Sequence, residues 1–246
     1  MLKKILLLLC VAIILPNIAH SEDPYQILDK YLEVTKASIR KDSIQSLKFT
    51  VVENASNPQT GQTASATVKY WYKKDSLYRV EQEAQGQKLK VGYDGKMLWW
   101  ASPIANGKLE EVPSSYADQV KAQIVGENIV GGSYANYNKD SLKLEFVEKV
   151  TADEKELFKI KLIGDKADQT MFLFFDAISG LLYKIEIETP QGIYARKTKN
   201  VTKSAGFFFP LKVEEWLGDK KVSEKTYQTI TVNPKIDERF FAMPEK

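Results

Sequence analysis

Apolar and polar residues alternate one by one along most of this chain. In residues 181–188 (Leu-Leu-Tyr-Lys-Ile-Glu-Ile-Glu) and 142–146 (Leu-Lys-Leu-Glu-Phe), the apolar positions fall on one side and the charged positions on the other. A period of two with Lys and Glu facing outward predicts an antiparallel sheet with one face in water. Turn signals such as Asp94-Gly95 and Ser179-Gly180 divide the pattern into about ten or eleven strands.

Two segments have helical spacing instead. Asp23 is a helix N-cap followed by Pro24 at the first helical position, and the pattern continues to near Ser38. Residues 114–127 form a second amphipathic stretch. Twisted open sheets rarely stay flat at a width of about ten strands, so a sheet with one apolar face must curl. We therefore predict a mainly β, α+β fold: a strongly curved, unclosed antiparallel β-barrel with helices covering its mouth.

The first 21 residues have the layout of a secretory signal peptide. Lys3 and Lys4 give a positive start, an apolar run covers residues 5–15, and Ala19-His20-Ser21 is a small-x-small cleavage signal. The apolar run is too short to span a membrane as a mature helix. We predict cleavage between Ser21 and Glu22, which leaves residues 22–246 as one domain.

The only cysteine, Cys10, and the only histidine, His20, would leave with this leader. Leu9 stands where a lipidation signal needs a small residue, so cleavage after Ser21 is favoured over acylation at Cys10. A mature chain without imidazole cannot form a Ser-His-Asp triad, and a zinc site is disfavoured. The net charge of +3 is too small to indicate a nucleic-acid partner. We predict a monomer that is not an enzyme and has no cofactor or metal; a hydrolase with two facing carboxylates is the alternative.

The segment from Lys90 to Pro103 predicts a hairpin. Asp94-Gly95 is a preferred type I′ pair, and a two-residue turn there makes Tyr93 and Lys96 cross-strand partners. Trp99 and Trp100 then point to opposite faces of the sheet. The first face carries Val91, Tyr93, Leu98 and Trp100, whereas Met97 and Trp99 lie on the outer face, where Trp99 is covered or exposed.

Three motifs, in order, resemble the LolA-like periplasmic lipoprotein carriers. Residues 93–103 resemble their D-G-K-x-L-W-x-x-x-P signature, and residues 206–210 (Gly-Phe-Phe-Phe-Pro) resemble a late G-x-x-[FY]-P strand. Residues 233–244 resemble the closing N-x-x-[IL]-[DP]-x-x-x-F-x-x-P pattern. One feature departs from the dedicated carrier: Lys73-Lys74-Asp75 stands where that protein has an Arg-Pro pair whose arginine helps to latch the lid. No latch residue is therefore assigned.

The resemblance implies an unclosed barrel with a helical lid over an apolar cavity, in the periplasm of a Gram-negative source. Family members shuttle or sense acyl chains of lipoproteins or other lipids. The alternative to a cavity is that the same side chains pack a core. Residues 172–175 (Phe-Leu-Phe-Phe) are apolar on both faces, so this strand is covered twice or lies under the lid. The candidate lining residues are Tyr70, Tyr72, Val91, Tyr93, Leu98, Trp100, Phe172, Phe174, Tyr183, Ile185 and Phe209.

Two functional hypotheses follow. The first is a carrier or binding protein for a lipid or a lipoprotein acyl chain, with a donor or acceptor protein in the inner or outer membrane. The second is a regulatory or assembly module that binds another envelope protein through the same curved sheet. Trp99 on the outer face is the best sequence support for the second hypothesis.

Overall fold

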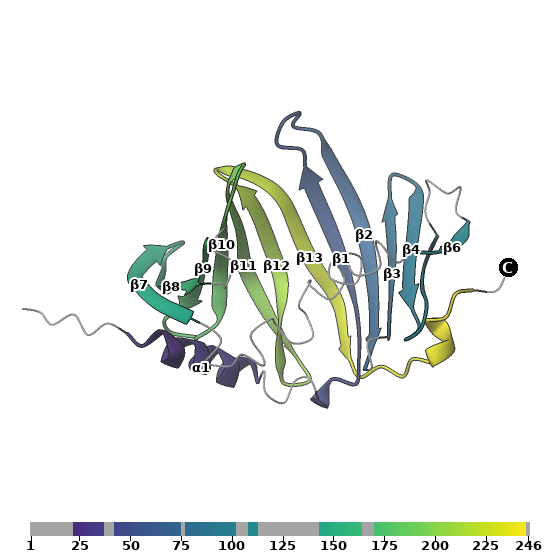
Figure 1. The fold of residues 1–246 in the computed structure, drawn as a ribbon, viewed down its shortest axis with the longest axis horizontal. Coiled ribbons are helices and arrows are strands. Elements are labelled where there is room, and N and C mark those ends of the chain that lie inside the picture. The colour runs from purple at the N-terminus through teal and green to yellow at the C-terminus, as the bar shows by residue number, and fades with distance from the viewer. Residues whose placement is uncertain are drawn as a thin grey trace, which may run out of the picture.

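The computed structural model describes residues 22–36, 42–74, 77–101, 108–112, 143–163 and 170–244. In these ranges the chain forms one antiparallel sheet of 13 strands (Figure 1). The strands are β1 Ser46–Ser56, β2 Thr63–Lys73, β3 Leu77–Ala84, β4 Gln87–Tyr93, β5 Leu98–Ala101, β6 Leu109–Glu111, β7 Lys143–Ala152, β8 Lys155–Ile163, β9 Thr170–Asp176, β10 Leu182–Thr189, β11 Gly192–Ser204, β12 Phe207–Leu217 and β13 Lys220–Val232.

The first and last strands meet in the middle of the sheet. The order is β6-β5-β4-β3-β2-β1-β13-β12-β11-β10-β9-β8-β7, so β6 and β7 form two edges and the barrel is not closed. This confirms the predicted curved, unclosed antiparallel sheet. The strand number is higher than expected, partly because β6 has only three residues, which is too short for an alternating pattern to reveal.

Alternation gives the sheet two faces. We call inner the face that carries Phe49, Tyr70 and Tyr227 at the centre and Leu173 and Phe175 near the β7 edge. The register links these two regions, because Ile185 pairs with both Leu173 and Arg196, and Arg196 donates to the Tyr227 hydroxyl. The opposite face is called outer.

Helix α1 (Pro24–Thr35) covers the inner face near the β7 edge. Its start is as predicted, because the Asp23 carboxylate accepts the backbone N–H of Tyr25 at 2.9 Å. Ile27 and Leu28 are buried against β8 and β9. The helix ends at Thr35 in the described residues. None of the helices in the described parts of the chain has the length and hydrophobicity of a membrane-spanning segment. The signal peptide predicted over residues 1–21 and the helix predicted over 114–127 lie outside the described residues.

The turn between β9 and β10 is fixed by Asp176. Its carboxylate accepts the backbone N–H groups of Ile178 at 3.1 Å and Ser179 at 2.7 Å, and Lys155 Nζ lies 2.9 Å from it. Lys30 of α1 donates to the carbonyl of Ala177, at 3.1 Å, in the same turn. The helix is therefore tied to the β9–β10 turn as well as packed on the sheet.

Stability should fall in acid through this carboxylate. Burial alone would raise the pKa of Asp176, but the hydrogen bonds from Ser179 and Lys155 outweigh it and hold the pKa at about 2, against 3.8 ordinarily. Because the folded pKa is lowered, the stabilisation is present above about pH 4 and is lost as the pH falls towards 2. We expect the wild type to lose about 2 kcal/mol more than Asp176→Asn between pH 5 and pH 2. Urea unfolding at each pH measures the free energy of unfolding of both proteins. An equal loss of free energy in the wild type and in Asp176→Asn between pH 5 and pH 2 would contradict the prediction.

The β4–β5 hairpin differs from its prediction in turn length. The register pairs Tyr93 with Leu98, so four residues, 94–97, form the turn and Lys96 is not the partner of Tyr93. The Asp94 carboxylate accepts the N–H groups of Lys96 and Met97, which closes the longer turn. The turn is longer than predicted by two residues. Because side chains alternate with a period of two, this change leaves Trp99 and Trp100 on the faces that were predicted.

Candidate ligand-binding face

The centre of the inner face is an aromatic and aliphatic surface on β1, β2, β12 and β13. Phe49 stacks on Tyr70 with ring centroids 4.6 Å apart, and Tyr227 lies 6.1 Å from Phe49 on its other side. Phe209 belongs to the same cluster. Each of these residues occupies an alternate position of its strand, so the apolar surface follows directly from the period of two.

A second apolar cluster continues the inner face over β3, β4 and β5. Tyr78 pairs with Tyr93, Tyr93 pairs with Leu98, and Val91 pairs with Trp100. The rings of Tyr78 and Tyr93 lie 5.6 Å apart. Together the two clusters place apolar side chains on the inner face of every strand from β5 to β12.

Eight of the predicted lining residues lie on this inner face. They are Tyr70, Tyr72, Val91, Tyr93, Leu98, Trp100, Ile185 and Phe209. Ile185 packs near α1 at the far side of the face. Phe49, Tyr78 and Tyr227 share the face and were not in the predicted set, although Phe49 stands in the alternating run of β1 and that signal could have found it.

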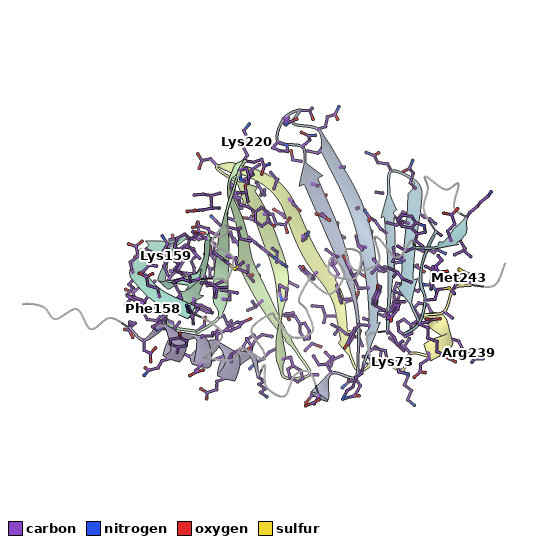
Figure 2. The ribbon with its side chains drawn as sticks, in the orientation of Figure 1. Lys73, Phe158, Lys159, Lys220, Arg239 and Met243 are labelled. Atoms are coloured by element: carbon purple, nitrogen blue, oxygen red, sulfur yellow. The ribbon has the colours of Figure 1, made fainter. Side chains whose placement is uncertain are left out.

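The other three predicted residues, Phe172, Phe174 and Tyr183, lie on the outer face. They pack with Leu157 in a separate cluster, whereas their neighbours Leu173 and Phe175 face α1. The strand is apolar on both sides, so its sequence does not distinguish the faces. On the neighbouring strand β8, Phe158 and Lys159 lie on opposite faces (Figure 2). Phe158 packs on the inner face with the α1 cluster. Lys159 lies on the outer face, with its Nζ 4.6 Å from the ring centre of Phe172.

Tyr183 has a structural environment on that outer face. Its hydroxyl contacts the Asp153 carboxylate, and Lys199 Nζ lies 2.8 Å from the same carboxylate and 3.2 Å from the hydroxyl. Burial and the bond to Asp153 raise the pKa of Tyr183. The bonds from Lys199 and Tyr183 hold the pKa of Asp153 at about 2. The group therefore fixes the β7–β8 turn to β10 and β11.

Charged side chains form a network on the inner face next to the central apolar cluster, on β1, β11, β12 and β13. Lys225 Nζ lies 3.2 Å from Glu215 and 3.9 Å from Glu53, and Ser223 donates to Glu53 at 2.9 Å. The Lys225 and Glu215 side chains are only 11% and 14% exposed. Arg196 stands beside them on β11 and donates to the Tyr227 hydroxyl at 3.4 Å.

This network makes the inner face amphipathic. Burial and the neighbouring Glu215 raise the pKa of Tyr194, so that hydroxyl stays protonated beside the charges. The charged residues of this network are Glu53 on β1, Arg196 on β11, Glu215 on β12 and Lys225 on β13. Their two cations and two carboxylates balance. In an alternating strand, charged residues are predicted to face water, which is why this network was not predicted from the sequence.

The C-terminal segment covers Trp99 on the outer face. Trp99 is 0% exposed, and its indole N–H donates to the Phe241 carbonyl at 2.8 Å. Arg79 donates to the Phe240 carbonyl at 2.9 Å, and its guanidinium lies 4.4 Å from the Phe240 ring centre. Gly92 lies under the indole, where an added Cβ would approach a ring atom to 2.3 Å. Trp99 is therefore internal packing and offers no surface to a partner.

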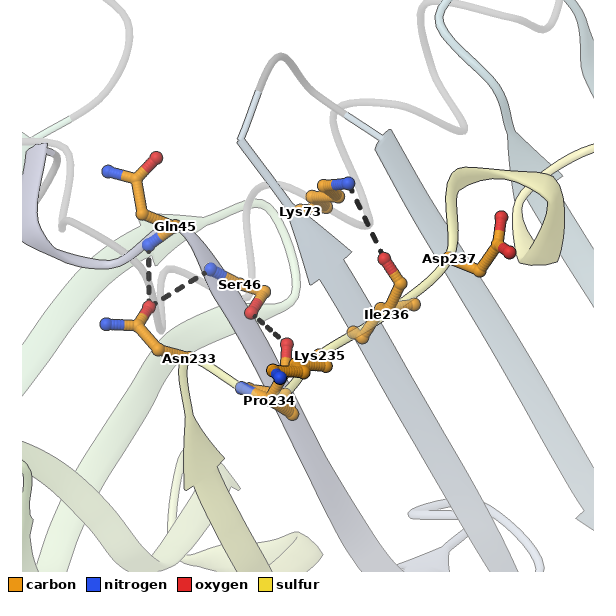
Figure 3. Close-up of a pocket in the computed structure, with 8 residues that line it drawn as sticks. All are labelled: Gln45, Ser46, Lys73, Asn233, Pro234, Lys235, Ile236 and Asp237. Carbon is orange, nitrogen blue, oxygen red and sulfur yellow. Dashed lines mark hydrogen bonds between the residues drawn. The ribbon is translucent and has the colours of Figure 1, made fainter.

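An open groove of about 700 Å³ lies where the C-terminal segment leaves β13 (Figure 3). Asn233, at a φ of 57°, accepts the backbone N–H groups of Gln45 at 2.8 Å and Ser46 at 3.2 Å. Ser46 in turn donates to the Pro234 carbonyl at 2.6 Å, and Lys73 pairs with Glu238 at 2.7 Å. These bonds fix the segment across the ends of β1 and β2. The first residue of the closing sequence motif, Asn233, therefore has a structural role.

Only the comparison with solved structures finds proteins similar to this chain. No protein-family model matches the chain, and none of the curated proteins does. Among solved structures, a DUF1329 family protein from Desulfovibrio piger has a TM-score of 0.60 at 12% identity, over 90% of this chain and 98% of that one. A LolA superfamily protein from Nitrosomonas europaea has a TM-score of 0.55 at 15% identity, over 89% and 96%.

A third solved structure is also similar in fold over most of its length. A putative outer membrane lipoprotein-sorting protein domain from Vibrio parahaemolyticus has a TM-score of 0.51 at 12% identity, over 87% of this chain and 97% of that one. At these identities the likeness defines the fold. The chain belongs to the class of unclosed, curved antiparallel sheets covered by a helix. Within that class it has a LolA-like fold.

Proposed function

We propose that this protein is a non-enzymatic periplasmic carrier that holds a lipid, or the acyl chain of a lipoprotein, against the inner face of its sheet. The observation that carries the proposal is the apolar surface of two neighbouring clusters on the inner face, one over β1, β2, β12 and β13 and one over β3, β4 and β5, in a sheet that does not close. The likeness in fold to a LolA superfamily protein and to a lipoprotein-sorting domain supports it. Residues 1–21 would direct export and would be removed by cleavage between Ser21 and Glu22.

Burial of the acyl chain is the driving force. Each methylene removed from water contributes about 0.8 kcal/mol, so a sixteen-carbon chain gives on the order of 10 kcal/mol before the ordering terms are subtracted. This is enough to hold a lipid in water without covalent chemistry. Trp99 no longer supports the regulatory-module hypothesis, because its indole is buried under the C-terminal segment.

A bulky side chain on the inner face should block binding. Ala66 lies on the inner face of β2, opposite Glu53 and Ala84, whereas its neighbour Thr67 points to the outer face. We expect Ala66→Trp to weaken binding of a palmitoyl probe at least about tenfold, because the indole occupies the volume of the chain. Thr67→Trp, the matched control, should bind like the wild type.

Displacement of a fluorescent acyl dye from each purified protein measures this difference. Circular dichroism must first show that both variants have the wild-type strand content. If Ala66→Trp and Thr67→Trp bind the probe equally well, the ligand does not lie on the inner face of the central strands.

A further inference from the structure

Two buried hydrogen-bond donors on the inner face have no hydrogen-bond partner among the described residues. Tyr78 is 4% exposed, yet its hydroxyl makes no hydrogen bond within the described part of the chain, and the same holds for the buried indole N–H of Trp100. Native proteins satisfy nearly all buried polar groups, because an unmade bond is costly. Two such donors in one cluster therefore indicate a missing acceptor.

The two donors belong to the same part of the inner face. Tyr78 is on β3 and Trp100 on β5, and Tyr93 and Val91 of β4 lie between them as their respective strand partners. Both donors pack in one apolar cluster with Val91 and Leu98. Their backbones are separated by two strand spacings, about 9–10 Å, and are offset by two residues, about 7 Å, along the strands. An acyl chain lying across β3–β5 would reach both.

The chemistry of the two groups selects the acceptor. An indole N–H only donates, and burial and the neighbouring Tyr93 raise the pKa of Tyr78, which keeps its hydroxyl protonated. The charged side chain that the register places on this part of the inner face is Glu110, opposite Trp100. A carboxylate ligand would meet repulsion there with no cation among the described inner-face residues of β3–β6. The acceptor should be strong and uncharged.

We propose that Tyr78 and Trp100 bind the carbonyl oxygen of an ester- or amide-linked acyl chain, which distinguishes acylated glycerol or acylated protein from free fatty acid. This inference rests on the proposed function, since it requires an acyl ligand on the inner face. It adds a polar specificity site to a surface that otherwise selects only for hydrophobic length.

A pair of probes that differ only in the carbonyl tests the proposal. 1-Palmitoylglycerol carries an ester, and 1-O-hexadecylglycerol has an ether at the same position with the same chain length. We expect the wild type to bind the ester about tenfold more tightly than the ether, and palmitate more weakly than the ester. Tyr78→Phe should abolish the preference for the ester and leave binding of the ether unchanged.

Thermal stability provides a second measurement. Because the Tyr78 hydroxyl makes no hydrogen bond within the described residues, Tyr78→Phe should keep or raise the melting temperature. Tyr183→Phe is the matched control, since its hydroxyl contacts Asp153 and Lys199 on the outer face. That variant should melt at a lower temperature and keep the wild-type preference for the ester.

The outcomes separate this inference from the proposed function. Equal affinity of the wild type for ester and ether, with tight binding of both, overturns the carbonyl site and leaves the carrier function standing. A persistent ester preference in Tyr78→Phe, or a clear loss of its melting temperature, also overturns the site. Failure of the wild type to bind any of the three probes removes the carrier function itself.

Discussion

Replacing Trp99 by alanine will lower the free energy of unfolding by about 3–5 kcal/mol. The indole is fully buried between β4 and the C-terminal segment, with Gly92 beneath it and Arg79 5.5 Å from its ring centre. Alanine leaves a cavity that the backbone of β4 cannot fill. It also removes the indole N–H that donates to the Phe241 carbonyl, so this carbonyl loses its hydrogen bond. Urea unfolding followed by circular dichroism measures the loss.

A matched pair of substitutions isolates the hydrogen bond. Trp99→Phe keeps an aromatic ring but loses the bond to Phe241, so it should cost about 1 kcal/mol beyond its packing loss. Trp216→Phe removes a buried indole N–H that makes no bond within the described residues, and should lose packing alone. If Trp99→Ala unfolds at the wild-type urea concentration, the C-terminal segment is not held to the outer face.

Replacing Lys225 by methionine will lower the free energy of unfolding by about 3 kcal/mol. Methionine has a similar length but no charge, so Glu53 and Glu215 are left facing each other without the cation between them. Removing one partner of a poorly exposed ion pair leaves an uncompensated charge, which is much more costly than losing a surface pair. The same urea experiment measures the change.

Two further variants test the reason for that loss. Adding Glu215→Gln to Lys225→Met restores charge balance with Glu53 and Arg196 nearby, and should recover part of the stability. Lys221→Met removes a more exposed lysine, paired with Glu224 at 2.8 Å, and should change stability by less than about 1 kcal/mol. Equal losses in Lys225→Met and Lys221→Met would show that the inner-face network does not depend on burial.

The sequence predicts the architecture because one periodic signal determines most of it. The period of two assigns Phe49, Tyr70 and Trp100 to a single face, and a change of turn length by two residues leaves that face intact. Asp23 and Pro24 likewise identify the start of α1 through local chemistry alone. Fold class and most of the apolar face thus follow from local patterns.

The remainder depends on contacts between distant residues. The outer-face position of Phe172 and Phe174 is decided by α1 packing on Leu173 and Phe175, which the doubly apolar strand does not reveal. Glu53 and Lys225 meet only because β1 pairs with β13. The burial of Trp99 requires a segment more than a hundred residues away. Pairing of this kind has no signature in a single sequence.

The central claim is that the inner face binds an acyl ligand, and native mass spectrometry tests it most directly. The protein is purified from its own host without detergent, and its intact mass is measured under non-denaturing conditions and after denaturation. We predict a non-denatured mass higher than the polypeptide mass by that of a bound lipid or acyl chain, which disappears on denaturation. A clean polypeptide mass in both conditions, with no uptake of added palmitoyl probe, would contradict the account.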